Sequence, residues 1–269
     1  MKNHKVGLIG ETSHWLINSG IDKNLLLTKL GIKLFTLPWS DLSSFKLIDE
    51  DKKFLTYFNN FIDSKKTIFD SGRIYSLLLD TVNKYHFSAI SVECFSLVKK
   101  YKVTGCLPLA KLNDENIIAA CEGDMVSCIT MLIVKELTTQ ISWMANLTDV
   151  NQNVLFSHCT IPTKLTKKYN ILTHFETDEG TAVEGDFIEN EVTILRLNNK
   201  LNKAFLTTGK VIERPKNPNN CRTQIVVQID DLSLNKLKTS PLGNHHIIIP
   251  KNHYDILKMF LEYFNFTII

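Results

Sequence analysis

The stretch CEGDMVSCITMLIVKEL, from Cys121 to Leu137, lies near the middle of the chain. An acidic turn around Gly123 leads directly into an apolar segment long enough for a helix. Glu122 and Asp124 can be ordinary charges at a helix start, because free N–H groups and the helix dipole favour carboxylates there. They can equally be a metal ligand or a general base at a strand-to-helix junction. The choice depends on which other ligand-type residues the fold brings to this turn.

Strands and helices alternate around this stretch. Strands are predicted at residues 5–10, 33–38, 89–94 and 142–147, and helices at 24–31, 52–62, 72–85 and 124–138. The segment 101–116 is predicted to be an irregular loop of the kind that often carries function. The alternation predicts an α/β fold, with a Rossmann-like, doubly wound parallel-sheet domain over residues 1–147. Such sheets bind ligands beyond the carboxyl ends of their strands.

The pattern changes to short strands near Asp149. They are predicted at residues 153–159, 171–176, 191–197, 204–212, 222–229 and 245–250, with turn-forming stretches such as NNKLN and RPKNPNN between them. A helix over 253–264 and a strand-like end follow. Residues 148–269 are therefore predicted to form a mainly antiparallel, β-barrel-like domain with a C-terminal helix.

Composition narrows the class of protein. The chain has 269 residues, 44% hydrophobic and 22% charged, with a formal net charge of +3, which is typical of a soluble globular protein. Basic residues form no block that favours nucleic-acid binding. The apolar runs are far shorter than the ~20 residues needed to span a bilayer, and the N-terminal run is too short for a signal peptide. We expect a cytoplasmic protein that binds neither nucleic acid nor membrane.

Several common site motifs are missing from the sequence. Its six cysteines form no CxxC pair, which argues against a zinc cluster, and a disulfide framework is not expected without a secretion signal. The sequence also lacks the P-loop, the GxGxxG dinucleotide fingerprint and the GxSxG nucleophile elbow.

Other ligand-type residues lie in the second half. Asp149 follows a predicted strand, and it is either a turn residue or part of the ligand-facing edge of the sheet. His158 and His174 lie in predicted strands, where a histidine is either packed, exposed or a ligand. His245 and His246 point to opposite faces of one strand, so only one of them can face a shared site. Two carboxylates with one or two histidines suit Mn²⁺ or a similar divalent ion.

A series of motifs in a fixed order resembles a known family. The series is CEGDMVSCITM, MANLTDVNQNVLFSHCTIP, THFETDEG, EVTILRL, CRTQIVVQI and GNHHIII. It resembles the L-fucose isomerase and L-arabinose isomerase superfamily, and most closely its fucose isomerase-like branch. The resemblance covers nearly the whole chain and is densest from Cys121 to Cys159. ETSHWLINSG, near the start, resembles the second N-terminal domain of that branch, and residues 148–269 resemble its C-terminal domain.

The resemblance implies an aldose–ketose isomerase that uses Mn²⁺ and an ene-diol intermediate. Glu122 and Asp149 match carboxylates that bind the metal and transfer protons, which is coherent chemistry for moving a carbonyl between neighbouring carbons. His245 matches the C-terminal histidine ligand, and the adjacent His246 makes this match ambiguous by one position. His158 matches the strand histidine that binds metal in the arabinose isomerase branch, whereas the fucose isomerase branch has no such ligand.

The resemblance also raises expectations about substrate and partners. The substrate is expected to be a small sugar or polyhydroxylated compound, and Arg222 is a candidate for contacting one of its hydroxyls, with a structural salt bridge as the alternative. Isomerases of this family usually carry a further N-terminal domain, which we expect this chain to lack. We therefore expect a homo-oligomer, or a partner that supplies the domain. The alternative function is a non-catalytic or partner-completed sugar-binding or metabolite-binding module that retains the fold.

Overall fold

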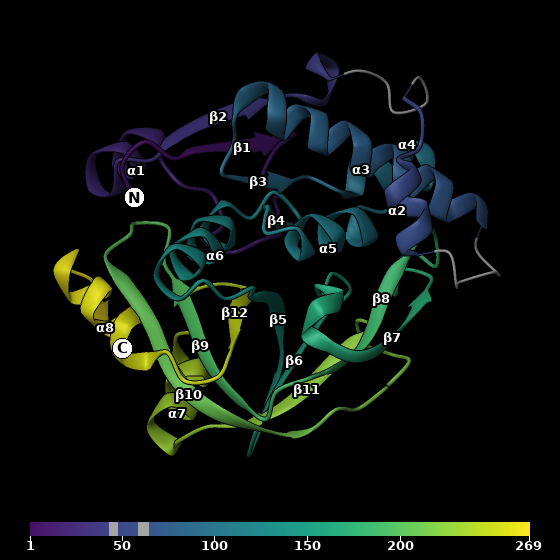
Figure 1. The fold of residues 1–269 in the computed structure, drawn as a ribbon. Helices are drawn as coiled ribbons and strands as arrows, with labels where there is room; N and C mark the ends of the chain where they lie inside the picture. Colours follow the sequence, from purple (N-terminus) through teal and green to yellow (C-terminus); the bar gives the residue numbers. More distant parts are fainter. Residues whose placement is uncertain (43–47, 59–64) are drawn as a thin grey trace.

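The computed structural model describes residues 1–42, 48–58 and 65–269 (Figure 1). Its first half contains a parallel sheet with the order β2-β1-β3-β4. These strands are β1 (Lys5–Ile9), β2 (Lys33–Leu37), β3 (Ala89–Val92) and β4 (Ile118–Ala120). Because β1 lies between β2 and β3, the chain winds in both directions from β1, as the sequence pattern predicts.

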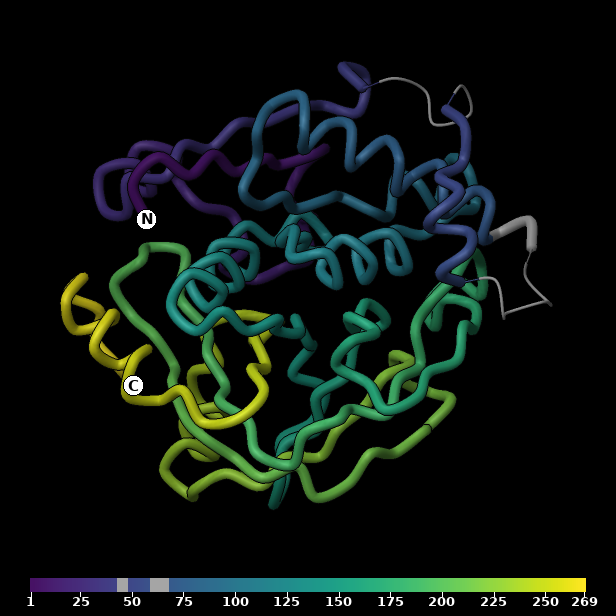
Figure 2. Tube along the Cα trace, in the orientation of Figure 1, coloured from purple at the N-terminus to yellow at the C-terminus, as the bar shows by residue number. Residues whose placement is uncertain are grey.

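Helices connect the strands of this sheet, and the last of them leads from β4 into the second half of the chain. They are α1 (Lys23–Leu30), η1 (Trp39–Asp41), α2 (Lys52–Tyr57), α3 (Lys65–Tyr85), α4 (Phe95–Tyr101), α5 (Cys106–Asp114) and α6 (Met125–Thr138). The predicted helix over 52–62 begins as α2, and its residues 59–62 lie outside the described part of the chain. Figures 1 and 2 show α5 and α6 between the parallel sheet and the second half of the molecule.

The prediction of an irregular loop over 101–116 was wrong, because most of this segment forms α5. Every residue of α5 is buried, Lys111 and Asp114 included. A helix that is buried on all sides lacks the apolar stripe that identifies an amphipathic helix in a sequence. Pro108 lies in the first turn, where a helix tolerates proline.

The second half is a closed antiparallel barrel. Its strands are β5 (Trp143–Val150), β6 (Val154–His158), β9 (Glu191–Leu197), β10 (Lys203–Glu213), β11 (Thr223–Gln228) and β12 (His245–Pro250). The order β11-β6-β5-β12-β9-β10 closes on itself because β11 also pairs with β10. This closure confirms a barrel-like, mainly antiparallel half.

Smaller elements surround the barrel. They are η4 (Thr163–Leu165), the two-stranded sheet of β7 (Thr166–Leu172) and β8 (Ala182–Phe187), α7 (Asp231–Thr239), α8 (Tyr254–Tyr263) and β13 (Thr267–Ile268). The strand predicted at 171–176 overlaps only the end of β7, and the chain then enters a loop that leads to β8. The predicted C-terminal helix is present as α8. In the described part of the chain, no helix has the length and apolar character needed to cross a bilayer.

The strand predicted at 142–147 does not belong to the parallel sheet. As β5, it pairs antiparallel with β6 and β12 in the barrel. The change from one sheet to the other therefore takes place between α6 and β5, and the predicted boundary between residues 147 and 148 lies within β5. Consequently, Asp149 is not at the ligand-facing edge of the parallel sheet.

Candidate metal centre at the junction of the two sheets

The acidic turn between β4 and α6 has an unusual backbone. Glu122 and Gly123 have φ angles of 59° and 65°, both in the left-handed region. A Cβ on Gly123 would lie 2.2 Å from the carbonyl oxygen of Glu11, so only glycine fits there. The loop after β1 holds the turn in place. Ser13 donates its N–H to the Glu122 carbonyl at 3.1 Å, and the Thr12 hydroxyl donates to the Gly123 carbonyl at 2.9 Å.

Asp124 caps helix α6 and also anchors two charged groups. One carboxylate oxygen accepts the N–H of Ser127 at 2.9 Å, which is the standard N-cap bond. The other lies 3.0 Å from Nη1 of Arg196 and 2.9 Å from Nδ1 of His245. Burial raises the pKa of Asp124, but Arg196 and His245 outweigh it and hold this pKa well below its usual range. Asp124 is therefore a buried carboxylate, and the oxygen that pairs with Arg196 also orients His245.

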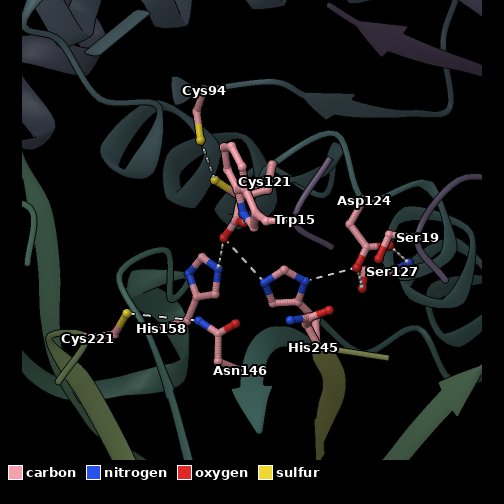
Figure 3. Close-up of polar contacts among 12 residues, drawn as sticks. Trp15, Ser19, Cys94, Cys121, Asp124, Ser127, Asn146, His158, Cys221 and His245 are labelled. Carbon is pink, nitrogen blue, oxygen red and sulfur yellow. Dashed lines mark hydrogen bonds and ion pairs between the residues drawn. The ribbon is translucent and has the colours of Figure 1, made fainter. Parts of the chain in front are cut away.

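Three potential ligand atoms meet on the other side of His245. Oε1 of Glu122 lies 3.4 Å from Nε2 of His245 and 3.8 Å from Nε2 of His158. Figure 3 shows the rings of His158 and His245 side by side, with Asp124 on the far side of His245. Ligand atoms of these three residues all lie within 4.8 Å of one another. The side chains come from the turn after β4, the end of β6 and the start of β12, so both sheets contribute to the group.

The ionisation states of the three side chains differ. Burial raises the pKa of Glu122, but contacts with His245, His158 and the Trp15 N–H lower it to about 2, so Glu122 is a carboxylate. Burial lowers the pKa of His158 to about 3, so its imidazole is neutral. Burial also opposes the charged form of His245, but Asp124 and Glu122 outweigh this and raise its pKa to about 9.

The group fits a divalent cation. Both ring nitrogens of His158 and Nε2 of His245 are buried and, within the described residues, have no hydrogen-bond partner. Unpaired buried polar atoms are costly, and a metal ion would satisfy Nε2 of both histidines. Nδ1 of His245 bonds to a carboxylate and leaves Nε2 free, which is the usual arrangement of a metal-binding histidine. One carboxylate oxygen and two imidazole nitrogens can therefore hold such an ion.

His246 lies away from this group. It follows His245 on β12, so its side chain points to the opposite face of the strand. There its ring packs against the rings of Phe156 and Phe205, each with a centroid distance of 5.8 Å. Burial lowers its pKa to about 3. The structure thus brings His245, and not His246, to Glu122.

Asp149 is not brought to the group either. It is exposed near the end of β5, where it accepts a hydrogen bond from Nδ2 of Asn151 at 2.7 Å. Asn146 is the residue of β5 that pairs with His245. Asp149 lies three positions farther along the strand, or roughly 10 Å away. It lines a separate cavity with residues such as Asn153 and Gln224.

Arg222 and His174 do not belong to the ligand group. Both stabilise a loop beside it. Nε of Arg222 donates to the carbonyl of Thr173 at 2.8 Å, and its guanidinium lies 6.0 Å from the ring centre of Phe175. Arg222 therefore supports a loop through hydrogen bonds, where the alternative expectation was a structural salt bridge. His174 is buried, with Nδ1 3.1 Å from the hydroxyl of Thr177.

A cavity of about 310 Å³ opens beside Glu122. Its polar lining includes Asn146, Ser157, Glu176 and Asn244, and the Trp15 ring forms part of its wall. The Trp15 N–H donates to Oε2 of Glu122 at 3.0 Å. Partial burial and the charge of Glu122 raise the pKa of Glu176, whereas His245 lowers it.

Sequence reasoning did not single out Trp15, Asn146 or Glu176. Their motifs, ETSHWLINSG, MANLTDV and THFETDEG, belong to the series that carries the family resemblance. Their position within these motifs was the feature of the sequence that could have indicated them as site residues. No residue type or spacing within those motifs distinguishes the three from ordinary loop and strand residues.

Comparisons with known proteins point to sugar isomerases. No family model matches the chain. Over 168 residues it is 27% identical to a sulfoquinovose isomerase from Clostridium sp. (strain MSTE9), covering 58% of this chain and 37% of that protein. Over 175 residues it is 23% identical to a sulfoquinovose isomerase from Alkalicoccus urumqiensis, covering 59% of this chain and 39% of that protein.

These matches are partial, since the aligned segments span less than two fifths of the length of either relative. They support a relation to the sugar isomerase superfamily. The fucose isomerase-like branch and the arrangement of domains stay predictions.

Proposed function

We propose that the chain carries the metal centre of an aldose–ketose isomerase, with Mn²⁺ or a similar divalent ion held by Glu122, His158 and His245. The observation that carries the proposal is the meeting of one carboxylate and two imidazoles with unpaired nitrogens at a polar cavity. The names of the two relatives support it independently, because both are sugar isomerases. The proposed substrate is a sugar or another polyhydroxylated carbonyl compound.

Different residues have different roles at the proposed site. When bound, the ion would polarise the carbonyl and hydroxyl oxygens of the substrate and stabilise negative charge on them. Asp124 holds the ring of His245 in the orientation that leaves Nε2 free. Trp15 holds the second oxygen of Glu122. The amide and hydroxyl groups of Asn146 and Ser157 line the cavity, where they can bind sugar hydroxyls.

One observation favours the alternative of a non-catalytic sugar-binding module. The family resemblance implies two carboxylates in the ligand set, whereas the group that the described residues form contains only Glu122. Such a module would bind metal and sugar without turnover. A second subunit, or a partner that supplies a further domain, stays a prediction for completing the cavity.

Metal content and an aldose panel test the proposal. The protein is loaded with Mn²⁺, freed of excess ion, and assayed for bound metal and for ketose formation from L-fucose, L-arabinose and sulfoquinovose. We expect stoichiometric metal, lost in Glu122→Gln and kept in the matched variant Asp149→Asn. Failure to bind any divalent ion at millimolar supply would contradict the proposal. Metal and sugar binding without turnover would establish the non-catalytic module instead.

A further inference from the structure

The proposed reaction needs a group that carries a proton between neighbouring carbons, and Glu122 is poorly placed to do this alone. Its Oε2 accepts the Trp15 N–H at 3.0 Å, and its Oε1 faces the two imidazoles of the ligand group. Trp15 therefore occupies one oxygen, and the other belongs to the proposed metal-ligand group. Asp149, the second carboxylate that the family resemblance implies, is exposed and lines another cavity.

A different carboxylate reaches the cavity from the loop between β7 and β8. Of the described residues that line this cavity, only Glu122 and Glu176 carry carboxylates. Glu176 approaches from the barrel half, beside Phe175, whereas Glu122 approaches from the turn before α6. The cavity therefore has one carboxylate in the ligand group and a second one outside it.

The loop that carries Glu176 is held by several contacts. Arg222 donates to the Thr173 carbonyl at 2.8 Å, and the Thr173 hydroxyl donates to Asp178 at 2.6 Å. The N–H of Asp178 donates to the carbonyl of His174 at 2.8 Å, which closes the loop around Glu176. The ring of His174 packs edge-on against Phe95 from the other half of the molecule. A side chain used for proton transfer needs such a fixed support.

We propose that Glu176 is the group that moves the carbon-bound proton in this isomerisation, an inference that rests on the proposed function. Its carboxylate takes the proton from C2 of the aldose, and the C–H electron pair forms the C1–C2 double bond of an ene-diolate. The resulting carboxylic acid returns the proton to C1 while C2 becomes the carbonyl carbon. The proton on O2 passes to O1, for which the Thr148 and Ser157 hydroxyls, 2.6 Å apart and lining the same cavity, provide a relay. No atom or electron is gained or lost, so substrate and product are isomers.

The test compares Glu176→Gln with Glu179→Gln, which removes a carboxylate from the same loop. Glu179 pairs with Lys102 at 3.2 Å and does not line the cavity. We expect kcat of Glu176→Gln to fall about 10²- to 10⁴-fold, the usual contribution of a general acid or base, with KM and bound Mn²⁺ unchanged. Exchange of the C2 deuterium of a labelled aldose should fall in parallel, and Glu179→Gln should resemble the wild type.

The possible outcomes separate this inference from the proposed function. Active wild type with a Glu176→Gln variant that keeps more than about a tenth of kcat overturns the inference alone. A Glu176→Gln variant that loses its metal or its circular dichroism spectrum also overturns it, because Glu176 would then be structural. A wild-type protein that binds Mn²⁺ but isomerises no aldose overturns the proposed function, and this inference with it.

Discussion

At the scale of single residues, the two carboxylates of the acidic turn differ although only one residue separates them. Asp124 is fully buried against the equally buried Arg196, whereas Glu122 faces the cavity. Gly123 between them allows the backbone to reverse, so the two side chains reach opposite sides of His245. The two substitutions should therefore have different consequences.

Asp124→Asn should destabilise the protein by about 3–5 kcal/mol, because it leaves the guanidinium of Arg196 buried without its partner charge. Glu122→Gln should cost less than Asp124→Asn in the absence of metal, because His245, unlike Arg196, can lose its proton when its partner charge is removed. Urea denaturation of the two metal-free variants measures the difference. Equal losses of stability would show that the buried Arg196 pair is not the reason Asp124 is needed.

Metal binding should release a proton from His245. In the metal-free protein, Asp124 and Glu122 raise the pKa of His245 to about 9, and a metal ligand must be deprotonated. The affinity for Mn²⁺ should therefore rise about tenfold per pH unit between pH 7 and pH 8. Calorimetric titration in buffers of different ionisation enthalpy counts the released proton.

The raised pKa of His245 also affects the stability of the metal-free protein, which should fall as the pH rises. A pKa raised from 6.5 to about 9 stabilises the folded state fully below pH 6.5, and this contribution is lost as the pH rises towards 9.

A metal affinity that does not change from pH 7 to pH 8 would contradict a charged His245. His158 is already neutral between pH 7 and pH 8, so it does not contribute to the pH dependence of the metal affinity.

At the scale of elements, the loop over residues 10–19 ties the acidic turn to the barrel. The N–H of Ile17 donates to Oδ1 of Asn244 at 2.7 Å, just before β12. The carbonyl of Asn18 accepts from Arg196, on β9, at 3.1 Å. The same loop carries Trp15 to Glu122. The ligand group can therefore form only when this loop stays in close contact with the acidic turn.

Gly123→Ala tests that contact. A Cβ there would lie 2.2 Å from the Glu11 carbonyl at a φ of 65°, so we expect a loss of about 1–3 kcal/mol and weaker Mn²⁺ binding. Gly20→Ala is the matched control, because its Cβ would lie 3.9 Å from the Thr12 hydroxyl. Thermal unfolding and metal titration compare the two variants. A Gly123→Ala protein as stable as Gly20→Ala would mean that the loop can move away without cost.

At the scale of the whole molecule, the two sheets form one packed unit. A single cluster of buried apolar side chains includes residues of the parallel sheet, of α6 and of the barrel. Helix α6 contacts β3 and β4 on one side and β9 and β12 on the other. The ligand group lies at the amino end of this helix, where the two sheets meet, so a bound ion would link both halves.

Mn²⁺ should therefore stabilise the entire fold. At a free concentration of 100 times Kd, an ion that binds only the folded protein adds about 2.7 kcal/mol to the free energy of unfolding. Urea unfolding with and without Mn²⁺ should show this gain in a single transition, and EDTA should reverse it. Glu122→Gln should show no gain. A gain confined to one of two separate transitions would contradict the coupling of the two halves.

Much of the fold is predictable from local patterns, and the exceptions have physical reasons. The alternation of strands and helices predicts the parallel sheet, because each element shows its own period. It misses α5, since a helix buried on every side shows no polar face. It also places β5 in the parallel sheet, because a strand sequence does not state which neighbours it pairs with.

For the candidate site, local sequence patterns predict an acidic turn with a glycine at its centre, a strand histidine, and a histidine pair on opposite faces of a strand. The folded chain establishes that His245 faces Glu122, that Asp149 lies about three residues beyond the site, and that Glu176 reaches the cavity. The reason is that the two-residue period of a strand separates neighbouring side chains but does not say which face meets another element. That choice depends on strand register and on the packing of the two sheets around α6.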